Sequence, residues 1–240
     1  MTDAIAEDGS KPSLLSTFIN IFTAPSEAFT QIRQRPSKLV PLAAVMLSMG
    51  LVLAWYFQML DFDWYIDEVL AQTGAEGDEL EQARNAMQSL SRNSFMTLGL
   101  LGSCAAIVAV NLLQAMYLSL ASALGNDRLG FGYWFSLSCW CGMPALLSVL
   151  AIAVNITLSS NGQLSPFDMD PLALPNLGVP VTNPSMLSLL NSINLPMVWG
   201  LVLLMLGYRQ WTERSLGFAV AIVGLPYVLV YGVWAYFILG

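Results

Sequence analysis

Five runs of this sequence contain no charged residue and are each long enough to cross a lipid bilayer. They cover residues 39–60, 94–124, 131–158, 186–208 and 215–239. An α-helix rises about 1.5 Å per residue, so the first run spans roughly 33 Å, about the hydrocarbon thickness of a bilayer. Only 10% of the chain is charged, against roughly 25% in an ordinary soluble domain. The sequence therefore predicts an all-α polytopic membrane protein with a five-helix transmembrane bundle.

Lysine and arginine gather at one end of these predicted spans. Short cytoplasmic loops are enriched in both residues, so their positions predict orientation. Seven of them lie in the segments before the first span, between the second and third spans, and between the fourth and fifth spans. They are Lys11, Arg33, Arg35, Lys38, Arg128, Arg209 and Arg214. Only Arg84 and Arg92 lie in a loop of the opposite side. We expect a cytoplasmic N-terminus and a C-terminus outside, in the periplasm if the membrane is a bacterial inner membrane.

The segment before the first span, residues 1–38, is predicted to be a cytoplasmic region with amphipathic helices at the membrane surface. Apolar residues at helical spacing follow Ser13, and a second short helix begins near Pro25 and ends with a cluster of cations. This region either anchors the chain on the inner leaflet or docks a cytoplasmic partner. The residues assigned to that role are Phe18, Phe22, Pro25, Phe29, Arg33, Arg35, Pro36 and Lys38.

Two long loops, residues 61–93 and 159–185, are predicted on the outer side. The first keeps helical spacing over 62–70 and 80–90, which predicts a helical hairpin, whereas the second holds five prolines and should be irregular. Each loop carries an acidic doublet, Asp61 with Asp63 and Asp168 with Asp170. These doublets are either solvated acids or, if the loops meet, oxygen ligands for Ca²⁺ or Mg²⁺.

Polar side chains inside the predicted spans are the most informative intramembrane positions. They are Asn111, Gln114, Ser119, Ser122, Asn191, Ser192 and Asn194. Such groups avoid lipid, so they either hydrogen-bond between helices or line a path for a solute, an ion or a lipid headgroup. A stripe of small residues at four-residue spacing, Ala115, Ser119 and Ala123, predicts close helix contact. Pro144, Pro196 and Pro226 are expected to kink the last three spans.

Several kinds of chemistry are excluded or disfavoured. The chain has no histidine, which excludes serine–histidine and cysteine–histidine catalysis and histidine zinc sites within it. Cys139 and Cys141 lie two residues apart and would point to nearly opposite sides of a helix, which argues against a shared metal ion. A net charge of −7 argues against nucleic acid. We predict no enzymatic activity, no cofactor and no metal site.

The stretch "IFTAPSEAFTQIRQRPSKLVPLAAVML" resembles the amino-terminal signature of bacterial members of the Yip domain family, the Ypt-interacting proteins. The stretch "GYWFSLSCWCGMPALLSVLA" also resembles the sequence pattern of that family. The predicted topology, five spans with the N-terminus inside, is similar to that of the family as well. The resemblance implies an integral membrane protein that associates with other membrane proteins or with itself. Eukaryotic members associate with Rab-type GTPases, but this chain lacks their long cytoplasmic region and D-L-Y/W-G-P motif, which argues against GTPase binding.

From these features we expect a non-enzymatic inner-membrane protein that contacts the lipid bilayer, organises membrane or recruits partners, and self-associates. The alternative is a transporter, channel or lipid-moving protein with a polar path between the second and fourth spans.

Overall fold

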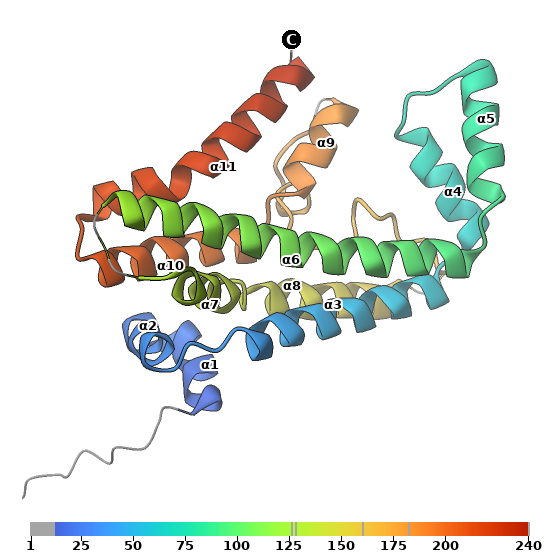
Figure 1. Cartoon of the computed structure of the whole chain (residues 1–240). Helices are drawn as coiled ribbons and strands as arrows, with labels where there is room; N and C mark the ends of the chain where they lie inside the picture. Colours follow the sequence, from blue (N-terminus) through green and yellow to red (C-terminus); the bar gives the residue numbers. More distant parts are fainter. Residues whose placement is uncertain (1–12, 126, 128, 160, 182, 240) are drawn as a thin grey trace, which may run out of the picture.

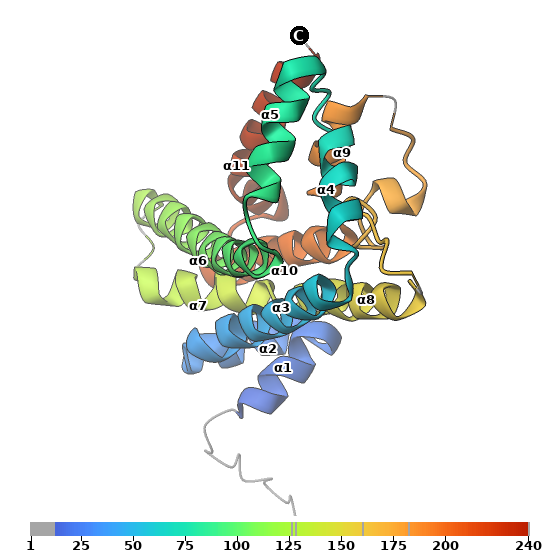
Figure 2. The same ribbon diagram turned by 90° about the vertical axis from the view of Figure 1, so that its right-hand side faces the viewer.

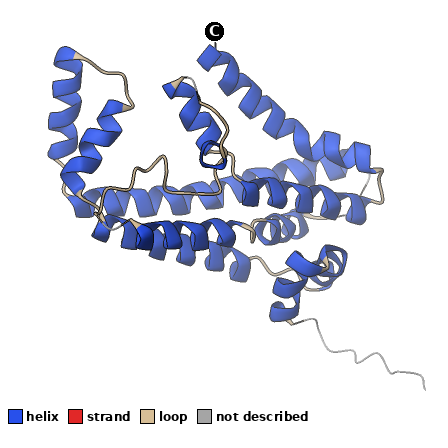
Figure 3. Cartoon of the chain, turned by 180° about the vertical axis from the view of Figure 1, so that it is seen from behind, coloured by secondary structure: helices blue, strands red, loops and turns tan. Residues whose placement is uncertain are grey.

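The computed structural model describes residues 13–125, 127, 129–159, 161–181 and 183–239. Lys11 and Arg128, which contribute to the predicted orientation, lie outside these residues. Every named secondary-structure element of the described part is a helix. These helices are joined by turns and loops, and one isolated β-bridge pairs Ala173 with Asn194. The all-α prediction is therefore confirmed (Figure 3).

The long helices form the body of the molecule (Figure 1). They are α3 (Leu39–Met59), α6 (Arg92–Leu124), α7 (Phe131–Cys141), α8 (Ala145–Leu158), α10 (Leu195–Thr212) and α11 (Leu216–Leu239). Within the described residues, four helical stretches are long and apolar enough to cross a membrane: Leu39–Met59, Arg92–Leu124, Phe131–Leu158 and Leu216–Ile238. These four agree with the first, second, third and fifth predicted spans.

The predicted fourth span, 186–208, is not one continuous helix. The chain forms α9 (Pro184–Asn191), leaves the helical path, and begins α10 at Leu195. Pro196 explains the break, because its ring would clash with the carbonyl four residues earlier and it has no N–H to donate. Asn194 caps the new helix by accepting a hydrogen bond from the Met197 N–H at 2.8 Å. Pro196 thus begins a helix instead of kinking one.

The other two span prolines act in different ways. Pro144 lies in a turn that separates α7 from α8, while Pro226 lies inside α11. Towards its C-terminal end α11 leans away from the other long helices (Figure 1). The helix of the third run is therefore interrupted just before α8, whereas α11 continues unbroken through Pro226.

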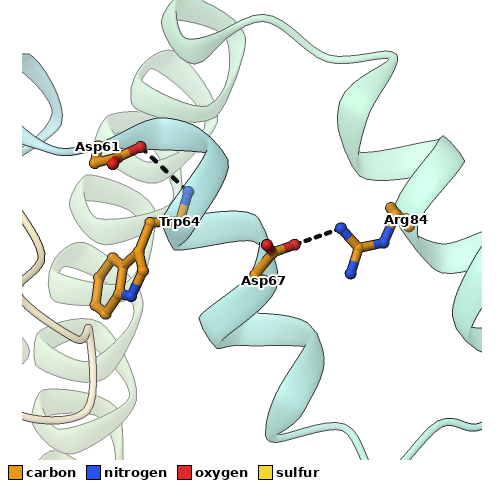
Figure 4. Close-up of polar contacts among 4 residues, drawn as sticks. All are labelled: Asp61, Trp64, Asp67 and Arg84. Carbon is orange, nitrogen blue, oxygen red and sulfur yellow. Dashed lines mark hydrogen bonds and ion pairs between the residues drawn. The ribbon is translucent and has the colours of Figure 1, made fainter.

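Shorter helices occupy the two sides of this body. The N-terminal pair, α1 (Leu14–Thr23) and α2 (Pro25–Gln34), lies on one side. The hairpin of α4 (Phe62–Ala71) and α5 (Gly77–Gln88) projects from the other side, as does α9 (Figure 2). The predicted helical hairpin is confirmed. Asp61 caps α4 by accepting from the Trp64 N–H, and Arg84 of α5 pairs with Asp67 of α4 (Figure 4).

The second long loop is irregular, as predicted, except for a short 3₁₀ helix at Pro175–Leu177. It is tied to the helix ends rather than lying loosely over them. The Tyr56 hydroxyl donates to the Leu164 carbonyl at 2.8 Å, and the Asp61 N–H donates to the Gly162 carbonyl at 2.8 Å. Within the described residues no three acidic or cysteine side chains gather as metal ligands would, so the two acidic doublets do not form one site.

The main hydrophobic core lies where α2, α7 and α10 meet. Its largest side chains, all at most 1% exposed, include Phe29, Trp134, Trp140 and Tyr208. The helices approach closely because α10 has glycines on the side that faces α7. A Cβ atom at Gly200 would lie 2.6 Å from the Cys141 carbonyl oxygen, and one at Gly207 would lie 2.8 Å from Leu137 Cδ1.

Candidate functional site

The two amides of the second span meet partners from two other helices. Ser138 of α7 donates to Asn111 Oδ1 at 3.0 Å and also lies within hydrogen-bond reach of Gln114 Oε1. Gln114 Nε2 donates to the Tyr227 hydroxyl of α11 at 2.6 Å, while Asn111 Nδ2 donates to the Ile107 carbonyl. Both amide nitrogens therefore donate within the protein, and the two amide oxygens share the single Ser138 hydroxyl, in a cluster that joins α6, α7 and α11.

A different set of residues of α6 forms its contact face. Ala115, Leu118 and Ser122 are at most 1% exposed, whereas Ser119 is only half-buried and Ala123 is exposed. The predicted stripe of 115, 119 and 123 is therefore wrong beyond its first residue. An α-helix has 3.6 residues per turn, so residues 115, 118 and 122 stay on one face of α6. Residues 115, 119 and 123 are each four apart, and each therefore lies further around the helix than the one before.

The polar residues of the predicted fourth span lie apart from the amides of the second. Asn194 donates from Nδ2 to Asp170 Oδ2 at 2.9 Å, and Ser148 of α8 donates to the same oxygen at 2.9 Å. Asp170 therefore ties the second long loop to α8 and to the start of α10. Asn191 in α9 is different: both polar atoms of its amide are buried, with no hydrogen-bond partner in the described part of the chain.

The second N-terminal helix is docked on the body of the protein. Ala28, Phe29 and Ile32 of α2 are at most 1% exposed, buried against α7 and α10. Trp211 Nε1 donates to the Phe29 carbonyl at 3.1 Å, and Gln210 Nε2 donates to the Ser26 carbonyl at 2.9 Å. Packing and hydrogen bonds thus fix α2 to the C-terminal end of α10.

The first N-terminal helix has two apolar faces. Thr17 and Ile21 are buried, and the rings of Phe18 and Phe22 pack edge to face at 5.6 Å beside the core. On the outward side, Leu15 is 69% and Ile19 50% exposed. Phe18 and Phe22, which the sequence assigned to surface anchoring, thus contact the protein, and the outward apolar pair is available to the bilayer.

The segment between α2 and α3 is held at one residue. The Ser136 hydroxyl and Trp140 Nε1, both from α7, donate to the Ser37 carbonyl at 2.9 and 2.8 Å. Lys38 Nζ lies 5.9 Å from the centroid of the Phe135 ring. Arg33 and Pro36 are exposed, as are Arg35 and Lys38. The proline-bounded link is thereby fastened to α7, while its cations remain exposed.

The sequence identified Asn111 and Gln114 but missed Ser138 and Tyr227, because neither side chain stands out from its own span. Trp211 and Gln210 were missed as partners of α2 for a similar reason. An aromatic residue at a membrane interface is expected in any helical membrane protein, so it gives no sign of a specific hydrogen bond.

The architecture was compared with known proteins. The Yip1 domain model matches residues 19–237, nearly the whole chain. No curated protein matches, and no solved structure matches. The match extends from α1 through α11 and thus includes the docked N-terminal helices as well as the long apolar helices. The chain is an integral membrane protein and belongs to the Yip1 domain family.

Proposed function

We propose that the chain is a non-enzymatic membrane protein that organises membrane or recruits other membrane proteins, and that it self-associates. The observation that carries this proposal is the docking of α2. Phe29 and Ile32 are buried in the main core, so the N-terminal helices form one body with the spans. A fixed surface of this kind suits recruitment, because a partner meets preorganised side chains and little ordering entropy is lost on binding.

The bonded amides of the second span support the same proposal. A path for solute needs polar groups that are free to exchange partners, whereas Asn111 and Gln114 both donate to protein groups and share the Ser138 hydroxyl as donor to their oxygens. Hydrogen bonds of this kind, measured between membrane helices, contribute about 0.6 kcal/mol on average and up to about 1.7. The cluster therefore acts as a modest helix connector.

The double substitution Asn111→Leu with Gln114→Leu separates the two functions. We expect the variant to insert, to lose stability by about 1–2 kcal/mol, and to leave liposome permeability unchanged, because the wild type moves no solute. The measurements are thermal unfolding in detergent, oligomer size, and dye or headgroup exchange in liposomes. Wild-type liposomes that exchange faster than protein-free ones, together with a folded but inactive variant, would contradict the proposal.

The alternative, a lipid-moving or transport protein, is favoured by Asn191 alone. Its amide is buried beside α11 with no hydrogen-bond partner among the described residues, as expected of a group that receives a transient ligand. The same liposome assay tests it with Asn191→Leu. Faster exchange by wild type than by protein-free liposomes, with loss of that activity in Asn191→Leu, would establish the alternative.

We further propose five crossings in a bacterial inner membrane, with the N-terminus in the cytoplasm and α10 as the fourth crossing. At about 1.5 Å per residue its 18 residues extend roughly 27 Å, near the bilayer thickness. The α6–α7 and α10–α11 connections lie at the same end of the long helices (Figure 1). Arg214 Nη2 joins them by donating to the Gly125 carbonyl at 2.8 Å.

This topology predicts opposite labelling of two exposed positions, Asn161 and Ser215. In a background without Cys104, Cys139 and Cys141, Asn161→Cys should react with an impermeant thiol reagent in intact cells. Ser215→Cys should react only after the cells are permeabilised. Labelling of both positions in intact cells would show that α10 does not cross, and the reverse pattern would invert the orientation.

A further inference from the structure

A cavity lies between the start of α2 and the end of α10. Its volume is about 580 Å³, and it is lined by Pro25, Ser26, Phe29, Leu206, Arg209, Gln210, Glu213 and Arg214. The lining changes character over one helical turn of α10, from the apolar Leu206 to the cationic Arg209. A turn rises about 5.4 Å, so this change spans the depth over which lipid chains give way to headgroups at a bilayer surface.

The charges in the cavity favour an anion. The lining contains two arginines, Arg209 and Arg214, and one acidic residue, Glu213. The Arg209 side chain makes no ion pair or hydrogen bond with any described residue. Arg214 uses Nη2 for the Gly125 carbonyl, and its other nitrogens make no hydrogen bond with the described part of the chain. Guanidinium groups bind phosphate oxygens with short, charge-assisted hydrogen bonds.

We propose that this cavity binds the phosphodiester headgroup of an anionic glycerophospholipid, with Arg209 as the principal contact. Arg214 adds a second cationic contact, and the half-buried Leu206 packs against the glycerol and the first methylenes. Arg209, which has no acidic partner among the described residues, favours a headgroup with a net negative charge, such as phosphatidylglycerol, over a zwitterionic one. The cavity is closed on one side by α2, so bound lipid would bridge the N-terminal helices and α10.

The test uses purified full-length protein that has been stripped of lipid and offered phosphatidylglycerol or phosphatidylcholine in detergent, with bound lipid counted by native mass spectrometry. We expect wild type to retain phosphatidylglycerol in preference. Arg209→Gln should weaken its retention about tenfold, the size of one lost charge-assisted hydrogen bond. Glu213→Gln should strengthen retention, because it removes the carboxylate that opposes the headgroup charge.

Two controls define the contrary results. Arg92→Gln removes an exposed cation at the start of α6 that does not line the cavity, and it should bind lipid as wild type does. Equal losses in Arg209→Gln and Arg92→Gln would overturn the proposal in favour of general surface charge. Displacement of the lipid by millimolar inorganic phosphate or glycerol 3-phosphate would assign the cavity to a small soluble anion instead. Unchanged retention in both cavity variants would overturn it entirely. The measurement records lipid binding alone, so it does not depend on the proposed recruiting function.

Discussion

Gly200→Ala is expected to destabilise the protein, although alanine is the better helix former. The new Cβ atom would lie 2.6 Å from the backbone carbonyl oxygen of Cys141, a contact that only separation of α7 and α10 can relieve. Overpacking of a tight core costs about 1–3 kcal/mol, more than the roughly 0.5–1 kcal/mol that alanine gains over glycine within a helix. Thermal unfolding in detergent measures the difference.

Two glycines of other helices provide matched controls for this substitution. Gly102 of α6 and Gly232 of α11 have open space where a Cβ would be added. Alanine at either position should leave the melting temperature unchanged or raise it slightly. A melting temperature of Gly200→Ala equal to those of the two controls would show that α7 and α10 do not approach as closely as described.

Phe29→Ala is expected to release the N-terminal helices from the bundle. The ring is 1% exposed and lies at the junction of α2, α7 and α10. Loss of a buried phenylalanine costs about 3–5 kcal/mol, and here the cost is borne by the contact between α2 and the long helices. We expect the segment before α3 to become protease-sensitive in inverted vesicles while the spans stay inserted.

Gln34→Ala is the control, because Gln34 is an exposed residue of the same helix. It should leave proteolysis of the N-terminal segment unchanged. If Phe29→Ala and Gln34→Ala were cut at the same slow rate as wild type, α2 would not depend on its buried ring for its position.

Helix type and approximate bounds could be predicted wherever the apolar runs are long and free of charge. The first, second and fifth runs needed only length and hydropathy, because a bilayer imposes both. The break before α10 was signalled by Asn194 and Pro196, a helix cap followed by a proline, but the continuous apolar character of 186–208 outweighed that local signal. Local capping chemistry determined where the helix begins.

The site was predicted less completely, because a sequence pattern does not say which surface covers an amphipathic helix. Phe18 and Phe29 were expected at the membrane, and both contact the core of the protein. A bilayer and a protein core select the same apolar residues, so the two environments cannot be distinguished by composition. Ser138 and Tyr227 were missed because their roles depend on the three-dimensional meeting of α7 and α11 with α6.

The central claim is that the N-terminal helices and the spans form one body, and a cross-link tests it most directly. Gln210 Nε2 donates to Thr30 Oγ1 at 3.1 Å, so the thiols of Thr30→Cys and Gln210→Cys should be joined by a short bifunctional thiol reagent that bridges the length of the lost glutamine side chain, in native membranes. The background lacks Cys104, Cys139 and Cys141, and Leu15→Cys with Gln210→Cys is the control pair, since Leu15 points away from the core. The account predicts rapid cross-linking of the first pair, slow cross-linking of the control, and loss of the fast reaction when Phe29→Ala is added. Equal rates for the two pairs would contradict it, because α2 would then move freely over the membrane surface.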